Sequence, residues 1–165
     1  MNVWRVIITH ESDPEPMLRW AKNTGRLAIG WGHIGNIKDN RYFSPQDISD
    51  AIKKYYPELN NAGHGGASLY HFCYNVQPDD LVIIGKNGKR YFFMEVEGGY
   101  EFNSTSEKPP SADYHHQRNA SVLSIDADKL WQLAGATHTE SHNFYWTFCK
   151  LQKPIDEAMK AALIE

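Results

Sequence analysis

Several features that would identify a protein class at once are scarce in this sequence. Its 165 residues include only two cysteines, Cys73 and Cys149, which lie far apart in apolar or aromatic surroundings. We therefore expect buried free thiols in a reducing cytoplasm rather than a disulfide framework. No run approaches the roughly 18 apolar residues that cross a bilayer, so we expect no membrane partner.

The chain also lacks an excess of positive charge and the common catalytic and nucleotide-binding signatures. Its formal net charge of −3 is not that of a general polyanion binder, although a local basic patch could still contact phosphates. It has no glycine-rich phosphate loop of the Rossmann or P-loop kind and no G-x-S-x-G nucleophile elbow. We expect no enzymatic activity, no catalytic residue and no cofactor.

What the chain does contain is short segments of both secondary-structure types. Strand patterns occur at 3–9, 26–32, 81–85, 90–102, 114–125 and 143–151, and helical patterns occur at 14–25, 44–57, 67–76, 126–135 and 154–165. Asn87-Gly88 predicts a hairpin, Gly98-Gly99 predicts a bend in a strand, and residues 60–66 predict a flexible joint. About six strands with short outer helices predict one α+β domain over residues 1–165, built on a curved sheet or partly closed β-barrel and ending in the helix at 154–165.

The histidines raise the question of a metal site. His138 and His142 stand four residues apart with Glu140 between them, a spacing that on a helix could share a zinc ion. The segment lies beside Gly135, lacks the HExxH order and has no third ligand at a convincing spacing. We favour a solvated loop and expect no metal. A small metal hydrolase that uses these histidines or His116 is the least favoured alternative function.

The segment "YHHQR" predicts a strand with unusual side chains on one face. Alternate residues of a strand share a face, so Tyr114, His116 and Arg118 would line up on one side. A ring, an imidazole and a guanidinium make an awkward core but suit a ligand surface, where a ring stacks and a cation meets a phosphate or a base edge. The alternative is an edge strand with ordinary exposed polar residues.

The segment "AIGWGHIGNI" places Trp31 at a strand end between two glycines. With so little side-chain cover, the indole would stand at the mouth of a pocket with room for a flat group beside it. Stacking of a base on such a ring contributes about 1–3 kcal/mol, and a methylated base suits the site because its methyl group needs no hydrogen bond. The alternative is that Trp31 plugs the end of the barrel.

Taken in order, these segments resemble a known group of nucleic-acid readers. The "IGW" strand, "SLYHFCYNVQPDDLVIIG", "FFMEVEGGYEF" and "YHHQR" are similar, over about residues 3–150, to the EVE-like and YTH-like members of the PUA superfamily found in modification-dependent restriction systems. The chain departs from that pattern at Asp79, where the family has glycine. The resemblance implies a PUA-like (EVE-type) fold that binds DNA or RNA in prokaryotic defence and accepts a modified, above all methylated, base by base flipping into an aromatic cage.

The resemblance also implies the residues of the site. Trp31, Tyr100, Tyr114 and His116 would form the modified-base pocket, with Tyr100 displaced by one position in its motif. Contacts to the nucleic-acid backbone would come from Arg118 and from basic residues near the tryptophan loop and on the predicted hairpin: Lys38, Arg41, Lys86, Lys89 and Arg90. The sequence contains no nuclease segment, so any cleavage would need a separate nuclease subunit. A protein-interaction module of a defence or toxin–antitoxin system is the alternative from another class.

Overall fold

The computed structural model describes residues 1–103, 108–135 and 147–164. Its strands are β1 (Val3–Ile7), β2 (Arg26–Ile29), β3 (Leu81–Lys86), β4 (Lys89–Val96), β5 (Glu101–Phe102), β6 (His116–Ser124) and β7 (Phe148–Lys150). Its α-helices are α1 (Glu15–Thr24), α2 (Pro45–Tyr55), α3 (Ala62–Tyr70), α4 (Ala127–Leu133) and α5 (Glu157–Ile164). A 3-10 turn, η1 (Gly32–Ile34), follows β2, and a π-helical turn, η2 (His71–Asn75), continues α3.

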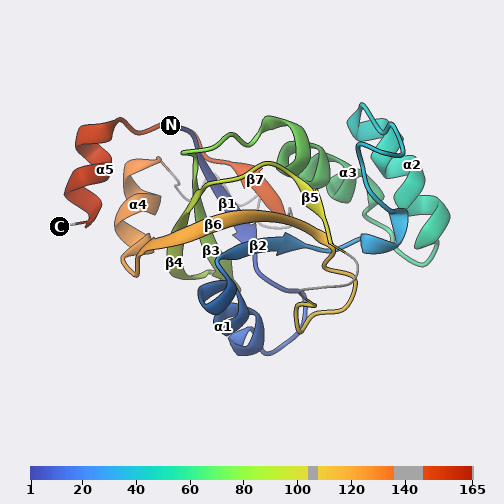
Figure 1. Ribbon diagram of the computed structural model, residues 1–165, viewed down its shortest axis with the longest axis horizontal. Coiled ribbons are helices and arrows are strands. Elements are labelled where there is room, and N and C mark those ends of the chain that lie inside the picture. The colour runs from blue at the N-terminus through green and yellow to red at the C-terminus, as the bar shows by residue number, and fades with distance from the viewer. Residues whose placement is uncertain (104–107, 136–146, 165) are drawn as a thin grey trace.

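A single curled sheet carries this fold, and the helices pack around it (Figure 1). Within the described residues the strand order is β2-β6-β4-β3-β1-β7, with the short β5 paired to β6 beside this path. β1 and β3 run parallel, whereas the other pairs are antiparallel, so the sheet is mixed. The predicted α+β class, with a curved sheet that forms a half-barrel and short helices outside it, is confirmed.

Both faces of the central strands are buried, and β3 shows how. Val82 and Ile84 belong to a hydrophobic cluster that α1, α2 and α3 cover, whereas Leu81 and Ile83 belong to a second cluster under α4 and α5. Because successive side chains of a strand point to opposite faces, an unbroken apolar run can serve two cores at once. Figure 1 shows the consequence, with α4 and α5 at one end of the sheet and α2 and α3 at the other.

Several predicted boundaries are confirmed by the local geometry that the sequence implies. Ser44 caps α2, since its side-chain oxygen accepts a hydrogen bond from the Asp47 amide at 3.1 Å, and Pro45 occupies the first helical position. Asn87 and Gly88 both have positive φ angles, of 53° and 78°, as a two-residue hairpin turn requires. The hairpin therefore joins β3 to β4 where the sequence predicted it.

Two predictions about helices are wrong. Residues 60–66 are not a flexible joint, because α3 begins at Ala62 and includes both Gly65 and Gly66. A Cβ at Gly66 would overlap the Ser49 hydroxyl and the Pro45 carbonyl oxygen, so glycine here serves close packing of α3 on α2. The last helix begins at Glu157 rather than at Pro154.

In the part of the chain that the structure describes, no helix is both long and apolar enough to cross a membrane.

Candidate functional site

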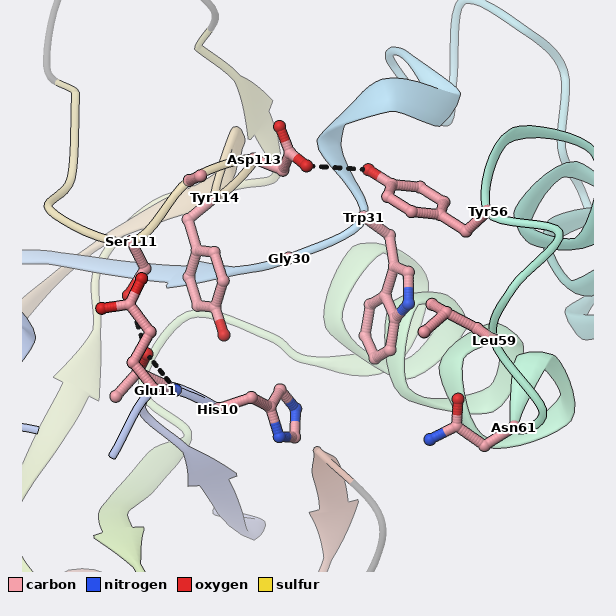
Figure 2. A pocket seen from close by; sticks show the side chains of 12 residues that line it. His10, Glu11, Gly30, Trp31, Tyr56, Leu59, Asn61, Ser111, Asp113 and Tyr114 are labelled. Carbon is pink, nitrogen blue, oxygen red and sulfur yellow. Dashed lines mark hydrogen bonds between the residues drawn. The ribbon is translucent and has the colours of Figure 1, made fainter. Parts of the chain in front are cut away.

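A cavity of about 440 Å³ opens where the ends of β1 and β2 meet two connecting segments. The first segment joins α2 to α3, and the second leads into β6. The residues that line the cavity are Thr9, His10, Glu11, Gly30, Trp31, Tyr56, Leu59, Asn61, Ser111, Ala112, Asp113 and Tyr114. Four stretches that are distant in sequence therefore converge on one site (Figure 2).

Two aromatic rings stand on opposite sides of this cavity, with His10 below the gap between them (Figure 2). Trp31 packs against α3, where a Cβ at Gly65 would lie 3.0 Å from its indole ring. Tyr114 packs over Gly30, the residue after β2, where a Cβ would lie 3.2 Å from its ring. Each ring thus rests on a glycine, and the cavity opens between the two rings (Figure 2).

The Trp31 main chain adopts a left-handed conformation, with φ 63° and ψ 34°. For a residue with a Cβ this region costs about 1–2 kcal/mol, and bulky residues adopt it rarely. Asp113, on the same rim of the cavity, has a φ angle of 64°, and its carbonyl oxygen accepts a hydrogen bond from the Gly32 amide at 2.8 Å. Strained residues persist where surrounding contacts over-determine them, and they cluster at functional sites.

The Asp113 side chain joins the segment before β6 to the end of α2. Its carboxylate lies 2.5 Å from His33 Nε2 and accepts a hydrogen bond from the Tyr56 hydroxyl at 3.4 Å. The Tyr56 oxygen in turn accepts from the His33 amide at 3.0 Å, and the two rings stack 5.4 Å apart. Burial, with the Asp113 charge adding to it, raises the pKa of Tyr56 to about 12. Tyr56 therefore remains a neutral phenol near neutral pH.

The opposite side of the cavity carries polar groups from the segment after β1 and from Ser111. The Thr9 and Ser111 hydroxyls are 2.7 Å apart, and the Thr9 oxygen accepts from the Glu11 amide at 3.1 Å. His10 Nε2 lies 2.9 Å from the Thr147 hydroxyl. Partial burial lowers the pKa of His10, and the Lys86 ammonium lowers it further. At neutral pH the imidazole is therefore an uncharged hydrogen-bonding group.

Of the four predicted pocket residues, the structure places Trp31 and Tyr114 in the lining and Tyr100 and His116 behind it. His116 is completely buried in β6, and its ring nitrogens contact the Trp31 carbonyl oxygen and the Tyr100 hydroxyl. Tyr100 also accepts a hydrogen bond from the Ile37 amide at 3.1 Å. These two residues support the wall that Trp31 forms and do not themselves line the cavity.

The prediction that Arg118 lies on a ligand-binding surface of β6 is wrong, because this residue is only 3% exposed. Its guanidinium donates to the carbonyl oxygens of Phe72 and Val76 at 2.7 and 3.0 Å. These carbonyls end the helical segment of α3 and η2, where the last turn leaves acceptors without intrahelical partners. Burial lowers the pKa of Arg118. The guanidinium is therefore committed to the core and is removed from the predicted phosphate contacts.

The other basic residues that were predicted to contact the nucleic-acid backbone differ in how exposed their side chains are. Lys86 is buried and donates to the Thr9 carbonyl oxygen at 2.9 Å, so it supports the β1 end of the cavity. Arg90 lies 2.5 Å from the Asp128 carboxylate and 4.7 Å from the centre of the Trp131 ring. Three basic side chains remain exposed and suited to meet phosphate: Lys38, Arg41 and Lys89.

Sequence reasoning missed the polar lining of the cavity, notably His10, Tyr56, Asn61 and Asp113. The sequence offered one usable signal, because Asp113 directly precedes Tyr114. His10 directly follows the predicted strand at 3–9, and Tyr56 lies near the end of the predicted helix at 44–57, positions at which side chains often meet at the edge of a sheet. Nothing in the sequence indicates that these particular ends converge.

The two histidines that raised the question of a metal site, His138 and His142, lie outside the described residues together with Glu140. Among the residues that are described, no group of three or more His, Cys, Asp or Glu side chains is placed to hold a metal ion. Cys73 and Cys149 are both buried and form no disulfide with each other, as expected. Burial raises the pKa of the Cys73 thiol to about 11, so it stays protonated.

Comparison with known proteins adds a family but no activity. No curated protein matches the chain. A family model described as a domain of unknown function, DUF8426, matches residues 4–138, a span that contains both aromatic walls of the cavity. The chain therefore belongs to the DUF8426 family.

Proposed function

We propose that the chain binds nucleic acid and accepts a modified base, flipped out of its strand, between Trp31 and Tyr114. The observation that carries this proposal is the cavity of about 440 Å³ with one aromatic ring on each side. That volume lies within the range of about 300–1,000 Å³ that is usual for small-ligand sites. A base with its modification, and part of the attached sugar, would fit.

The chemistry of the lining favours a base over a phosphate or another anion. Each aromatic face offers stacking worth about 1–3 kcal/mol to a base of any kind. The groups that could meet a base edge, Tyr56 and His10, are neutral, whereas the carboxylates of Asp113 and Glu11 would repel an anion in the cavity. The resemblance to EVE-like and YTH-like readers supports the same assignment through Trp31 and Tyr114.

The exposed charges predict weak binding that prefers single strands. Of the basic residues assigned to phosphate contacts, Lys38, Arg41 and Lys89 are exposed, and the chain carries a net charge of −3. Each phosphate contacted contributes a slope of about −0.7 to −0.9 to the dependence of log affinity on log salt concentration, so a shallow slope is expected. Extruding a base from a duplex costs a few kcal/mol, which a single strand largely avoids. A separate nuclease subunit is the partner that we propose for any cleavage of the bound strand.

The test is a fluorescence anisotropy titration with labelled single-stranded and duplex oligonucleotides. Each oligonucleotide is prepared in an unmodified form and in forms that carry 5-methylcytosine, 5-hydroxymethylcytosine or N6-methyladenine. We expect one modified strand to bind selectively, and Trp31→Ala to weaken it by about tenfold or more, as loss of a stacking contact predicts. Trp31→Phe should retain part of the affinity.

Trp20→Phe provides the matched control, because Trp20 lies in α1 and does not line the cavity. It should leave binding unchanged. If every oligonucleotide binds equally, or none binds to the folded protein, the proposal is wrong and Trp31 is a structural plug.

One observation favours the second candidate, a protein-interaction module. Three large apolar side chains around α2 are exposed: Phe43, which precedes the helix, is 60% exposed, Tyr55, its last residue, 46%, and Leu59, in the cavity lining, 38%. Large apolar surface left exposed to solvent can serve as a docking surface. A protein partner whose capture is abolished by Phe43→Ser, and is indifferent to added nucleic acid, would support this function instead.

A further inference from the structure

Behind the tryptophan wall, three hydrogen bonds form a continuous chain through the protein interior. The Ile37 amide lies 3.1 Å from the Tyr100 oxygen, and that oxygen lies 2.7 Å from His116 Nδ1. His116 Nε2 then lies 3.0 Å from the Trp31 carbonyl oxygen. The chain begins in the loop after η1, crosses β6 and ends on the residue that forms the cavity wall.

The chemistry of the two ends decides the direction of every bond between them. A carbonyl oxygen only accepts, so His116 Nε2 must carry a hydrogen and donate it to Trp31. A neutral imidazole has one ring N–H, which leaves Nδ1 to accept from the Tyr100 hydroxyl. The Tyr100 oxygen then accepts from the Ile37 amide, which only donates. Every member is satisfied only while His116 is neutral, and complete burial lowers its pKa to about 4.

We propose that His116 and Tyr100 are positioning residues that hold the Trp31 main chain in its left-handed conformation and thereby keep the indole at the cavity wall. This inference rests on the proposed function only in treating that wall as a binding surface. Neither residue lines the cavity, so both act through Trp31. The other hydrogen bond to the Trp31 carbonyl, from the Ile34 amide, is longer, at 3.3 Å.

The chain of hydrogen bonds also links two parts of the proposed interface. Ile37 directly precedes Lys38, which is exposed and suited to contact phosphate. Loss of the Tyr100 hydroxyl would therefore free the main chain at Ile37 as well as the indole at Trp31. A buried network of this kind orients its members only when all of them are paired.

The experiment is a fluorine NMR spectrum of protein labelled with 5-fluorotryptophan, recorded without ligand. The chain has five tryptophans, and Trp31→Phe identifies the resonance of Trp31 by its absence. In His116→Leu and Tyr100→Phe we expect this resonance to shift or broaden while the other four stay in place. His116→Gln should restore it in large part, because a side-chain amide also offers an acceptor oxygen and N–H donors.

A general loss of stability must be separated from a loss of position. Phe93→Leu is the matched control, because Phe93 is fully buried in the cluster under α4 and α5. It should destabilise the fold and leave the Trp31 resonance unchanged. If His116→Leu does not fold, Tyr100→Phe, which removes one hydroxyl, decides the question. If the Trp31 resonance is the same in the wild type and in every folded variant of His116 and Tyr100, the inference is overturned.

Oligonucleotide binding gives an independent second readout. Where the wild type binds a modified strand, Tyr100→Phe should weaken that binding by about tenfold, and His116→Gln should weaken it much less. If the wild type binds no oligonucleotide, the proposed function fails and the fluorine spectrum still decides whether His116 positions Trp31. If binding is selective but unchanged in Tyr100→Phe and His116→Leu, the inference fails and the proposed function stands.

Discussion

The two sides of the sheet differ in what their side chains do. The cluster under α4 and α5 is built from apolar side chains such as Val3, Leu81 and Phe93. The side toward α2 and α3 carries the cavity, left-handed main chain at Trp31 and Asp113, and the buried polar groups of β6. Apolar packing stabilises without orienting anything for a ligand, whereas strain and buried hydrogen bonds orient particular groups at a cost in stability.

The largest effect that should distinguish the two sides is acid destabilisation through His116. Its pKa is about 4 in the folded protein, against an ordinary value of 6.5 for histidine, so the unfolded chain binds the proton more tightly. The contribution of neutral His116 to the free energy of unfolding is therefore complete above pH 6.5. It is lost as the pH drops toward 4, by about 3 kcal/mol in total. Urea unfolding between pH 7.5 and about 4.5 measures this loss.

His116→Gln should remove that part of the pH dependence and provides the comparison. The pKa values of His10 and His71 are also lowered by burial, so a smaller acid dependence with the same sign should remain in the variant. Equal slopes for the wild type and His116→Gln would show that His116 is not held neutral.

An intermediate effect comes from two glycines of the same helix. A Cβ at Gly65 would lie 2.8 Å from Ile52 Cδ1 and 3.0 Å from the Trp31 ring, whereas nothing lies within 4 Å of one at Gly63. We expect Gly65→Ala to cost about 1–3 kcal/mol by overpacking and to displace the indole. Gly63→Ala should stabilise α3 by up to about 1 kcal/mol. Thermal unfolding of both variants, with tryptophan fluorescence, measures the contrast, and similar shifts would contradict it.

The smallest effect concerns strain that serves no binding site. Asp79 has a φ angle of 75° in the exposed turn before β3, far from the cavity lining in sequence. Asp79→Gly should stabilise the protein by up to about 1 kcal/mol, because glycine adopts this conformation without a Cβ penalty. Oligonucleotide binding should stay the same. Chemical denaturation measures the stability. Lower stability or weaker oligonucleotide binding in the variant would show that the aspartate side chain matters.

Local chemistry explains which parts of the fold could be predicted from the sequence. Ser44-Pro45 marked the start of α2 and Asn87-Gly88 marked the hairpin, because caps and turns depend on residues within a few positions. The glycines of α3 misled the prediction, since their purpose is contact with Ser49 and Trp31, which are distant in sequence. From the sequence alone, a glycine-rich helix that packs closely on another helix is predicted as a flexible joint, because the neighbouring helix is unknown.

The candidate site divides in the same way. Trp31 between two glycines was recognisable as an unusual ring, and Tyr114 belonged to a segment with unusual side chains. The sequence could not show that β6 is covered on both sides, so His116 and Arg118 were expected at a surface and lie instead in the core. Alternation along a strand assigns residues to two faces, but only the strand's neighbours decide whether either face meets solvent.

Local residue patterns were enough to establish the α+β class, the caps and turns, and the presence of a tryptophan between two glycines. Only folding in three dimensions brought β1, β2, the α2–α3 connection and the segment before β6 together around one cavity. The same packing placed a neutral, buried His116 behind the indole of Trp31. The physical reason is that local propensities act over a few residues, whereas a cavity and a chain of buried hydrogen bonds exist only when distant segments pack together.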